Sequence, residues 1–267
     1  MSYSVQLYSV RDALSQDLPG TLRRLAELGF TQVEPYGFAA LADQLGPALR
    51  ENGLSAPTGH ASLLSADQDE IFTAARELGI GTVIDPFVEP AQWQDAGSVR
   101  DIAERLNAAA KKGAEYGIRV GYHNHYWEIG STLEGTTALE FFAGLLDPEV
   151  VLEVDAYWVA AGGQNPAAFL RRLGDRVVAV HLKDGPITVL PGDGFDPEQM
   201  AGITASQLPA GQGEVNIWDV IDAAPGLEVG VVEFDDYAGD IFEGLAASLA
   251  YLDAGRPDSG APSEAGA

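Results

Sequence analysis

The chain alternates short apolar runs with longer segments of helical periodicity throughout its length, and this alternation constrains the fold most. The runs are rich in β-branched and aromatic residues, as buried strands are. Between them, apolar residues recur at three- and four-residue spacing, which is typical of helices with one buried face. The predicted strands are Val5–Tyr8, Gln32–Glu34, Ser55–Gly59, Thr82–Asp85, Arg119–His123, Val150–Asp155, Val177–His181 and Val229–Glu233.

The ends of the predicted helices repeat one device. A Leu-Gly or similar pair precedes the next strand, and glycine there supplies the left-handed conformation that closes a helix. Two helix starts are indicated by capping-box spacing, at Asp67 with Glu70 and at Ser98 with Asp101. The closing pairs are Leu28-Gly29, Asn52-Gly53, Leu78-Gly79, Tyr116-Gly117 and Leu173-Gly174.

Eight strands, each followed by a helix, predict an α/β protein that forms a single closed parallel (β/α)8 barrel, or TIM barrel. A doubly wound open sheet is the alternative, but no Gly-x-Gly-x-x-Gly motif follows the first strand. We expect the barrel to span residues 1–253. Residues 254–267, which are rich in Gly, Pro, Ser and Ala, are expected to form a flexible, disordered tail.

The connection Asp184–Asn216 is the longest between predicted elements and contains several prolines and glycines. Its length favours a functional loop over the mouth of the barrel. Within it, Gly211-Gln212-Gly213 is interpreted as a turn, because it comes too late in the chain and is too short to be a dinucleotide fingerprint.

Composition excludes several classes of protein. The net charge of −25 argues against a nucleic-acid partner, since affinity for the phosphate backbone comes largely from Lys and Arg. The chain has no cysteine, so disulfides, zinc–thiolate sites and thiol nucleophiles are excluded. The first residues lack a signal peptide, and no apolar run reaches the roughly 20 residues that span a bilayer. We therefore expect a cytoplasmic protein without a membrane partner, and a homo-oligomer is possible.

All four histidines, His60, His123, His125 and His181, lie at or near the C-terminal end of a predicted strand. In parallel α/β proteins this is the edge where ligands bind. His123 and His125 would point to the same side of an extended chain, with Asn124 on the other. The ordinary alternative is that they are hydrogen-bonded residues of the surface or the core. Four histidines at one edge favour a site.

Carboxylates occupy the same strand ends. Glu34, Asp155 and Glu233 close three of the predicted strands, Glu128 follows His125, and Lys183 follows His181. Carboxylates crowded around one point repel each other unless a cation lies among them. Oxygen ligands with an imidazole suit Mn²⁺, Mg²⁺ or Co²⁺. The alternative is that some of these side chains are helix caps or exposed loop residues.

Short motifs along nearly the whole chain resemble the xylose isomerase-like TIM barrels, and in particular the sugar phosphate isomerase/epimerase family. Each motif alone is weak, but together and in this order they are specific for the superfamily. The motifs are Gln6-Leu7-Tyr8-Ser9-Val10-Arg11, Gly29-Phe30-Thr31-Gln32-Val33-Glu34, Tyr122-His123-Asn124-His125-Tyr126-Trp127-Glu128, Glu153-Val154-Asp155-Ala156-Tyr157-Trp158, Val180-His181-Leu182-Lys183-Asp184, Gly211-Gln212-Gly213 and Val232-Glu233-Phe234-Asp235.

The resemblance implies a divalent metal, most often Mn²⁺, with Mg²⁺, Co²⁺ or Zn²⁺ also possible. Its ligands would be Asp155, His181, Glu233 and a carboxylate after the fifth strand. Many members have a glutamate where this chain has His123. Because the chain resembles the subgroup with a Tyr-His-Asn-His motif and a glutamate shortly after it, the fourth ligand is assigned to Glu128, with His123 as the alternative. Several relatives also carry a histidine where this chain has Trp158. The expected substrate-binding residues are Glu34, His60, Asn124, Trp158 and Lys183.

The resemblance also implies the chemistry. In the usual isomerase mechanism two carboxylates on opposite faces of a sugar move a proton through a metal-stabilised enediolate. Here Glu233 would serve one face, Glu128 is a further candidate, and His123 or His125 would serve the other. Lys183 and Arg11 are the basic residues expected near the mouth, so a phosphate site is weakly supported.

The expected function is that of a metal-dependent sugar or keto-sugar isomerase or epimerase. A lyase or hydrolase acting on 3-keto-glycosides or inositol-like keto-polyols is the alternative on the same barrel. A non-catalytic sugar-binding barrel is a third reading, from another class. DNA-repair nucleases of this fold are disfavoured, because they need a histidine-rich multi-zinc site and a basic surface.

Overall fold

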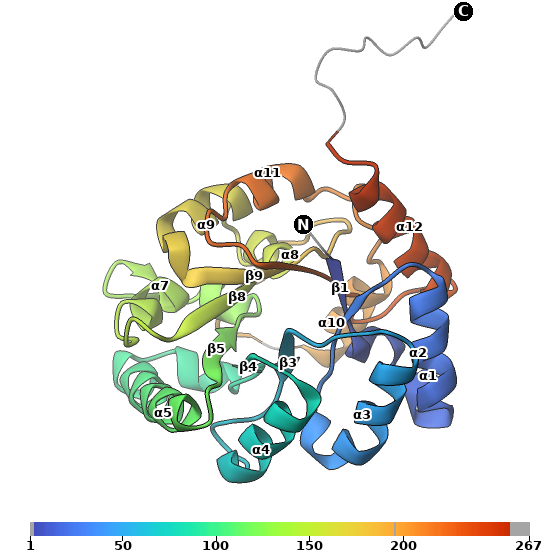
Figure 1. Ribbon diagram of the computed structural model, residues 1–267. Coiled ribbons are helices and arrows are strands. Elements are labelled where there is room, and N and C mark those ends of the chain that lie inside the picture. Colours follow the sequence, from blue (N-terminus) through green and yellow to red (C-terminus); the bar gives the residue numbers. More distant parts are fainter. Residues whose placement is uncertain (1–2, 195, 257–267) are drawn as a thin grey trace, which may run out of the picture.

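The computed structural model describes residues 3–194 and 196–256. The expected tail from residue 257 onward lies outside these residues, so the division into a barrel over 1–253 and a tail over 254–267 stays a prediction. Figure 1 looks along the barrel, with the strands inside and the helices in a ring around them. Among the described residues, none of the helices combines the length and the apolar character needed to cross a bilayer.

Eight parallel strands form one sheet, whose order is β2-β1-β10-β9-β8-β5-β4-β3. The prediction of a TIM barrel is confirmed. The predicted bounds are met at both ends for β2, β4, β5 and β9. The barrel strands are β1 (Tyr3–Gln6), β2 (Gln32–Glu34), β3 (Thr58–His60), β4 (Thr82–Asp85), β5 (Arg119–His123), β8 (Val151–Asp155), β9 (Val177–His181) and β10 (Val229–Val232), and a separate small hairpin pairs β6 (Thr132–Leu133) with β7 (Thr136–Thr137).

The ring closes between β2 and β3 by backbone hydrogen bonds in which at least one partner flanks the regular strand. Val33 N donates to Ser55 O over 2.9 Å, and Ser55 N donates to Thr31 O over 3.1 Å. Further along, His60 N donates to Pro35 O at 2.8 Å. The chain around residue 55 therefore pairs with β2 as the sequence predicts, although regular strand structure in β3 begins only after Pro57.

Helices surround the barrel and fill the connections (Figure 1). Their buried faces supply most of the hydrophobic core, which lies between helices and strands. The helices are α1 (Arg11–Gln16), α2 (Leu18–Glu27), α3 (Ala42–Glu51), α4 (Gln68–Leu78), α5 (Ala96–Glu115), α6 (Trp127–Gly130), α7 (Ala138–Ala143), α8 (Ala156–Ala161), α9 (Pro166–Leu173), α10 (Pro197–Ala205), α11 (Ile217–Asp222) and α12 (Ile241–Asp253), with the 3-10 turns η1 (Leu7–Val10), η2 (Phe38–Leu41), η3 (Pro90–Trp93) and η4 (Gly174–Arg176).

Helix ends follow the sequence signals closely. All five glycines predicted to close helices have positive φ angles, between 63° and 108°. Asp67 caps α4 and accepts hydrogen bonds from the backbone N–H groups of residues 69 and 70. The prediction that α5 starts at Ser98 is wrong, because Asp95 caps this helix and accepts from Gly97 N and Ser98 N.

The first strand begins and ends two residues earlier than the predicted Val5–Tyr8. After Gln6 the chain leaves the sheet and turns into η1, where the Gln6 side chain accepts a hydrogen bond from Tyr8 N. Tyr8 therefore sits at the C-terminal mouth of the barrel instead of inside the sheet, and its side chain is 40% exposed.

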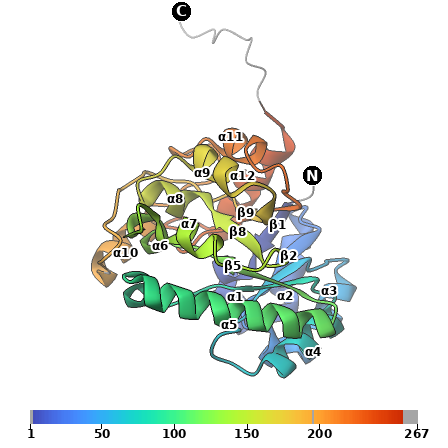
Figure 2. The same cartoon turned by 90° about the vertical axis from the view of Figure 1, so that its left-hand side faces the viewer.

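The connection after β9 is held by one carboxylate. Asp184 accepts hydrogen bonds from the backbone N–H groups of Gly185, Gly211, Gly213 and Val215, at 2.8–2.9 Å. The turn predicted at Gly211-Gln212-Gly213 is confirmed, with Gly211 at a φ of 82°. Figure 2 shows α10, which belongs to this connection, on the same side of the molecule as α6.

Candidate functional site

The site lies inside the barrel, one layer above a small apolar cluster. Alternate residues of a strand face the same side, so Val229 and Val231 of β10 are followed on that side by Glu233. Val229 and Val231 pack with Ala179 of β9, which is followed in the same way by His181. The strands thus present an apolar layer first and a polar layer at the mouth.

Glu153 is the centre of the deeper part of the polar layer. Its Oε2 atom lies 2.5 Å from His60 Nε2, 3.1 Å from His181 Nε2 and 3.2 Å from His123 Nδ1. All four side chains are buried. Although burial opposes the charged carboxylate, His181 and His60 lower the pKa of Glu153 well below its usual value. Three imidazoles from β3, β5 and β9 therefore surround one anionic oxygen.

Sequence reasoning did not single out Glu153 as a site residue. A signal for it was present, because Glu153 lies two residues before Asp155 in β8 and must face the same side of the strand. The strand around it is otherwise apolar, so a glutamate there needs a buried partner.

Glu34 lies beside the same imidazoles. Its Oε1 atom accepts a hydrogen bond from Gln6 Nε2 over 2.8 Å and lies 2.9 Å from His181 Nε2. Burial and the neighbouring carboxylate of Glu153 raise the pKa of Glu34. Its other oxygen has no hydrogen-bond partner among the described residues. Glu34 is thus close to the site but packed beneath the cavity described below, which it does not line.

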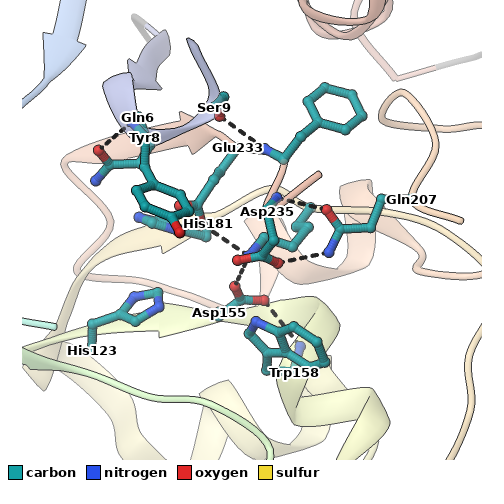
Figure 3. A network of polar contacts seen from close by, with 12 residues as sticks. Gln6, Tyr8, Ser9, His123, Asp155, Trp158, His181, Gln207, Glu233 and Asp235 are labelled. Carbon is teal, nitrogen blue, oxygen red and sulfur yellow. Dashed lines mark hydrogen bonds and ion pairs between the residues drawn. The ribbon is translucent and has the colours of Figure 1, made fainter. Parts of the chain in front are cut away.

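A second group lies nearer the mouth and is drawn in Figure 3. It comprises His123, Asp155, His181 and Glu233, whose potential ligand atoms all lie within 4.8 Å of one another. His181 Nδ1 is 2.6 Å from Glu233 Oε2. All four residues are buried, and they come from β5, β8, β9 and the first residue after β10.

This group fits a divalent ion by its donor chemistry. Two carboxylates and two imidazoles are a mixed oxygen and nitrogen set, which suits Mn²⁺, Co²⁺ or Zn²⁺ and accommodates Mg²⁺ less well. His123 and Glu233 also line the cavity, whereas Glu153 does not. An ion held here would therefore reach a molecule in the cavity. His60, His123, Glu153 and His181 form a second group that could hold an ion, and two of them, His60 and His123, also line the cavity.

Lys183 supplies the positive charge for the carboxylates of this group. Its Nζ atom lies 2.9 Å from both Asp155 Oδ2 and Glu233 Oε2, and 2.6 Å from Asp235 Oδ2. Although burial opposes its charge, these three carboxylates raise the pKa of Lys183 well above its usual value. Burial raises the pKa of Asp155 to about 6, and Lys183 opposes that rise.

His125 has a different environment from the other three histidines. Its ring stacks on Trp127 at 4.3 Å between centroids and meets the edge of Phe87 at 5.7 Å. Burial and the nearby His123 lower the pKa of His125 well below its usual value, so the imidazole is neutral near pH 7. It lines the cavity and is able to accept a proton there.

Glu128 does not belong to either group. Its carboxylate accepts hydrogen bonds from the hydroxyl of Tyr122 and from the backbone N–H of His125, both at 2.8 Å. Burial raises the pKa of Glu128 to about 8. Glu128 does not line the cavity, and His123 takes its expected place beside Asp155, His181 and Glu233.

Two further predicted residues hold the site in place. Asn124 accepts a hydrogen bond from Asp155 N over 3.1 Å and does not line the cavity. Trp158 N donates to Asp155 Oδ1 over 3.0 Å, as the cap of α8 requires. The ring of Trp158 lines the cavity, with Lys183 behind it at 5.4 Å from the ring centre.

The cavity above these residues has a volume of about 640 Å³. Its floor is polar and includes His60, His123 and Glu233. Of the predicted site residues, His125 and Trp158 also line it, while the remaining ones lie beneath or beside it. Arg11 reaches its edge, where it donates to the backbone oxygens of Tyr8 and Asp235.

Residues 22–225 match the family model of the xylose isomerase-like TIM barrel. The chain belongs to this family. The chain is similar to a solved sugar phosphate isomerase/epimerase from Parabacteroides distasonis, with 24% sequence identity. The two structures superimpose with a TM-score of 0.76 over 95% of this chain and 94% of that one. A probable 3-DHS dehydratase from Bacillus anthracis superimposes with a TM-score of 0.71 over 95% and 99%, at 17% identity.

Two other comparisons bear on ligands and chemistry. A xylose isomerase-like barrel from Mycobacterium smegmatis, solved in complex with magnesium, superimposes with a TM-score of 0.66 at 19% identity, over 94% of this chain and 95% of that one. An inosose dehydratase from Clostridium tetani is 31% identical over 100 residues. That match spans 37% of this chain and only 30% of the relative's own length.

Proposed function

We propose that the chain is a divalent-metal-dependent enzyme that removes the proton next to the carbonyl group of a keto-sugar or keto-polyol. The observation that carries this proposal is the convergence of His123, Asp155, His181 and Glu233 at the floor of the cavity, within 4.8 Å of one another. We infer that these four residues, and not Glu128, hold the ion.

A divalent ion at this place supplies a Lewis acid that polarises a carbonyl oxygen. Mn²⁺ is proposed, because two imidazoles in the set favour it over Mg²⁺, which prefers oxygen ligands and bound water. A cytoplasmic location is proposed with it.

Proton transfer falls to residues on two sides of the cavity floor. Although burial opposes its charge, Lys183 and His181 lower the pKa of Glu233 well below the usual value, so this carboxylate is anionic. His125 is neutral and lies beside Phe87 and Trp127. A substrate lying between Glu233 and His125 has an acceptor for its proton on either side. This arrangement supports general base catalysis by one residue. The proton returns from that same residue or, on the other face, from the second residue once it has taken a proton from water.

The fate of the proton separates two candidate reactions. Return of the proton to the same or the neighbouring carbon gives an epimerase or an isomerase. Loss of the hydroxyl group from the next carbon, which leaves as water with the proton that the base has taken up, gives a dehydratase. The inosose dehydratase relatives favour this second candidate, which is a lyase, as much as the isomerase/epimerase structure favours the first.

Solvent exchange tests the step that both reactions share. Keto-sugars and inososes are incubated with the Mn²⁺-loaded protein in D₂O and followed by NMR. We expect deuterium at the carbon next to the carbonyl of at least one compound. Binding without exchange in the whole series would favour the non-catalytic sugar-binding barrel and contradict the proposal.

The variant Asp155→Asn tests the site. Asparagine keeps the oxygen that caps α8 but weakens metal binding, so bound metal and exchange should both be lost. The fold should be retained, because Lys183 keeps Glu233 and Asp235 as partners. The surface variant Asp147→Asn, far from the cavity lining, is the control and should keep both. Full metal content in Asp155→Asn would remove this residue from the proposed set.

A further inference from the structure

We propose that the cavity takes an uncharged sugar joined to an apolar ring, as in an aryl glycoside, and not a phosphorylated sugar. This inference rests on the proposed function in one respect, which is that the sugar part lies at the polar floor above His123 and Glu233. It goes further by assigning the outer part of the cavity to the substituent on the sugar.

Two pairs of aromatic rings line the cavity. Tyr8 and Tyr36 meet edge to face, with ring centres 5.3 Å apart. Phe87 and Trp127 meet in the same way at 5.5 Å. All four line the cavity. They come from η1, from the segment after β2, from the segment after β4 and from α6, so four separate connections bring aromatic rings to one place.

Two of these aromatic side chains, those of Tyr8 and Phe87, belong to exposed residues. Tyr8 is 40% exposed and Phe87 is 45% exposed. In the described part of the chain only Leu41 and Val189 share this property among the large apolar residues. Single exposed apolar residues are common, but two facing one cavity form a surface that an apolar ligand group would cover. α10 closes a further side with Met200 and Ala201.

The size of the cavity agrees with a two-part ligand. Its volume of about 640 Å³ lies within the range of roughly 300–1,000 Å³ that encloses drug-sized molecules. A single sugar ring above the polar floor leaves the aromatic rim without contacts. A ring attached to that sugar would fill it and would stack or pack edge to face against the four aromatic side chains.

The charges at the cavity oppose a phosphate group. Lys183 is buried behind Trp158 and is paired with three carboxylates, so it does not reach the cavity. Arg11 donates to two backbone oxygens and lies over the Tyr8 ring at 4.5 Å. Three carboxylates, Glu233, Asp235 and Asp236, line the same cavity. Among the side chains that line the cavity, a dianion would meet these three carboxylates and a single guanidinium, that of Arg11.

The experiment compares binding of matched probes to the Mn²⁺-loaded full chain by calorimetry. The probes are phenyl and methyl β-glycosides of glucose, galactose and xylose, with glucose 6-phosphate as the charged probe. We expect the phenyl glycoside of at least one sugar to bind about tenfold or more tightly than its methyl counterpart, from ring packing alone. Glucose 6-phosphate should bind more weakly than the phenyl glycoside.

Three variants locate the effect. Phe87→Ala and Tyr36→Ala should each reduce the preference for the phenyl glycoside, because each removes one side of the rim. Val189→Ala is the matched control, since Val189 is 67% exposed but does not line this cavity, and it should keep the preference. Equal binding of phenyl and methyl glycosides, no binding of either, tighter binding of glucose 6-phosphate, or an equal loss of preference in Val189→Ala would each overturn the inference.

The binding readout is separate from the test of the proposed function, because it requires no turnover. A phenyl preference in a protein that exchanges no deuterium into keto-sugars supports the aromatic subsite and contradicts the proposed chemistry. Deuterium exchange without a phenyl preference supports the proposed chemistry and contradicts the aromatic subsite.

Discussion

Lys183, which does not line the cavity, links carboxylates that belong to β8 and to the segment after β10. Breaking a buried ion pair by removal of one partner is strongly destabilising, so Lys183 fixes the positions of Asp155 and Glu233 even without a divalent ion. The proposed metal ligands are thus arranged before any ion binds, which lowers the cost of binding.

The two neighbouring histidines of β5 are expected to differ in their roles. His125→Gln should lower turnover by about 10²–10⁴-fold, the usual contribution of a general acid or base, and leave metal content unchanged. His123→Gln should lose bound metal, because its imidazole belongs to the group around Asp155 and Glu233. Metal content and turnover measured on the same preparations check both. Metal loss in His125→Gln, or unchanged turnover, would contradict this division.

Asp85 at the end of β4 should make stability depend on pH. Burial raises its pKa to about 6, although Leu64 N and Phe87 N donate to the carboxylate. The unfolded chain, with a pKa of about 3.9, releases this proton first, so the stabilising contribution is complete below pH ~4 and is lost as pH rises through ~6. The loss amounts to about 3 kcal/mol over these two pH units.

In the variant Asp85→Asn the titrating carboxyl group is replaced by an amide. Urea unfolding of both proteins between pH ~4 and ~7 should show a free energy of unfolding that falls less steeply with pH in the variant. The variant is expected to be less stable overall, because its amide group keeps only one acceptor oxygen for the two backbone N–H groups of Leu64 and Phe87. The same pH slope in both proteins would show that Asp85 is not the group responsible.

The site was predictable where a residue follows a strand directly. Asp155, His181 and Glu233 were expected together, and the structure brings them together. Glu128 was expected with them but is turned away by the start of α6. Its position depends on a turn of a few residues, for which the sequence offers no periodicity. Glu153 was hidden inside an apolar run, where only alternation with Asp155 marks it.

At the scale of elements, the strands and helix ends are where sequence reasoning succeeds best. Strands such as β5 and β9 have their predicted bounds because apolar runs stop where polar site residues begin. The predicted first strand, Val5–Tyr8, ends two residues too late, because Leu7 is apolar and buried in η1 as it would be in a strand. An apolar run alone does not distinguish these two conformations.

Gly79 at the end of α4 permits a direct test of the glycine caps. It has a φ of 75°, and nothing lies within 4 Å of the position that a Cβ atom would take. Gly79→Ala should therefore lower the free energy of unfolding by about 1 kcal/mol through backbone strain alone. Denaturant unfolding measures it.

The matched control is two residues further along. A Cβ atom on Gly81 would meet only Pro57 O at 3.8 Å, and its backbone is not left-handed. Gly81→Ala should therefore leave stability unchanged or raise it slightly. An equal loss in both variants would indicate that strain at the left-handed position is not the cause.

For the whole molecule, the net charge of −25 is the dominant electrostatic property. With 40 acidic and 15 basic residues, most carboxylates have no cation to pair with. Repulsion among them opposes the compact state, and salt screens it. Exposed ion pairs such as Arg119 with Glu228 lose strength in salt, but each contributes little.

Salt should therefore stabilise the protein. Raising NaCl from about 0.02 M to about 0.3 M shortens the screening length several-fold and should raise the melting temperature by a few degrees. Choline chloride at the same concentrations should act equally, because screening does not depend on the identity of the cation. A fall in melting temperature would show that ion pairs outweigh the repulsion.

The attachment of the long connection at Asp184 has a consequence for how such a protein diversifies. Gly185 and Gly211, at the two ends of the segment that carries α10, are fixed by the same carboxylate. The cost of closing a loop grows only slowly with its length, so this segment tolerates insertion and replacement. New sequences there would reshape the mouth of the cavity while Lys183 and His181, just before the anchor, stay where they are. The loop that shapes the cavity mouth can therefore change in evolution while the residues at the strand ends stay the same.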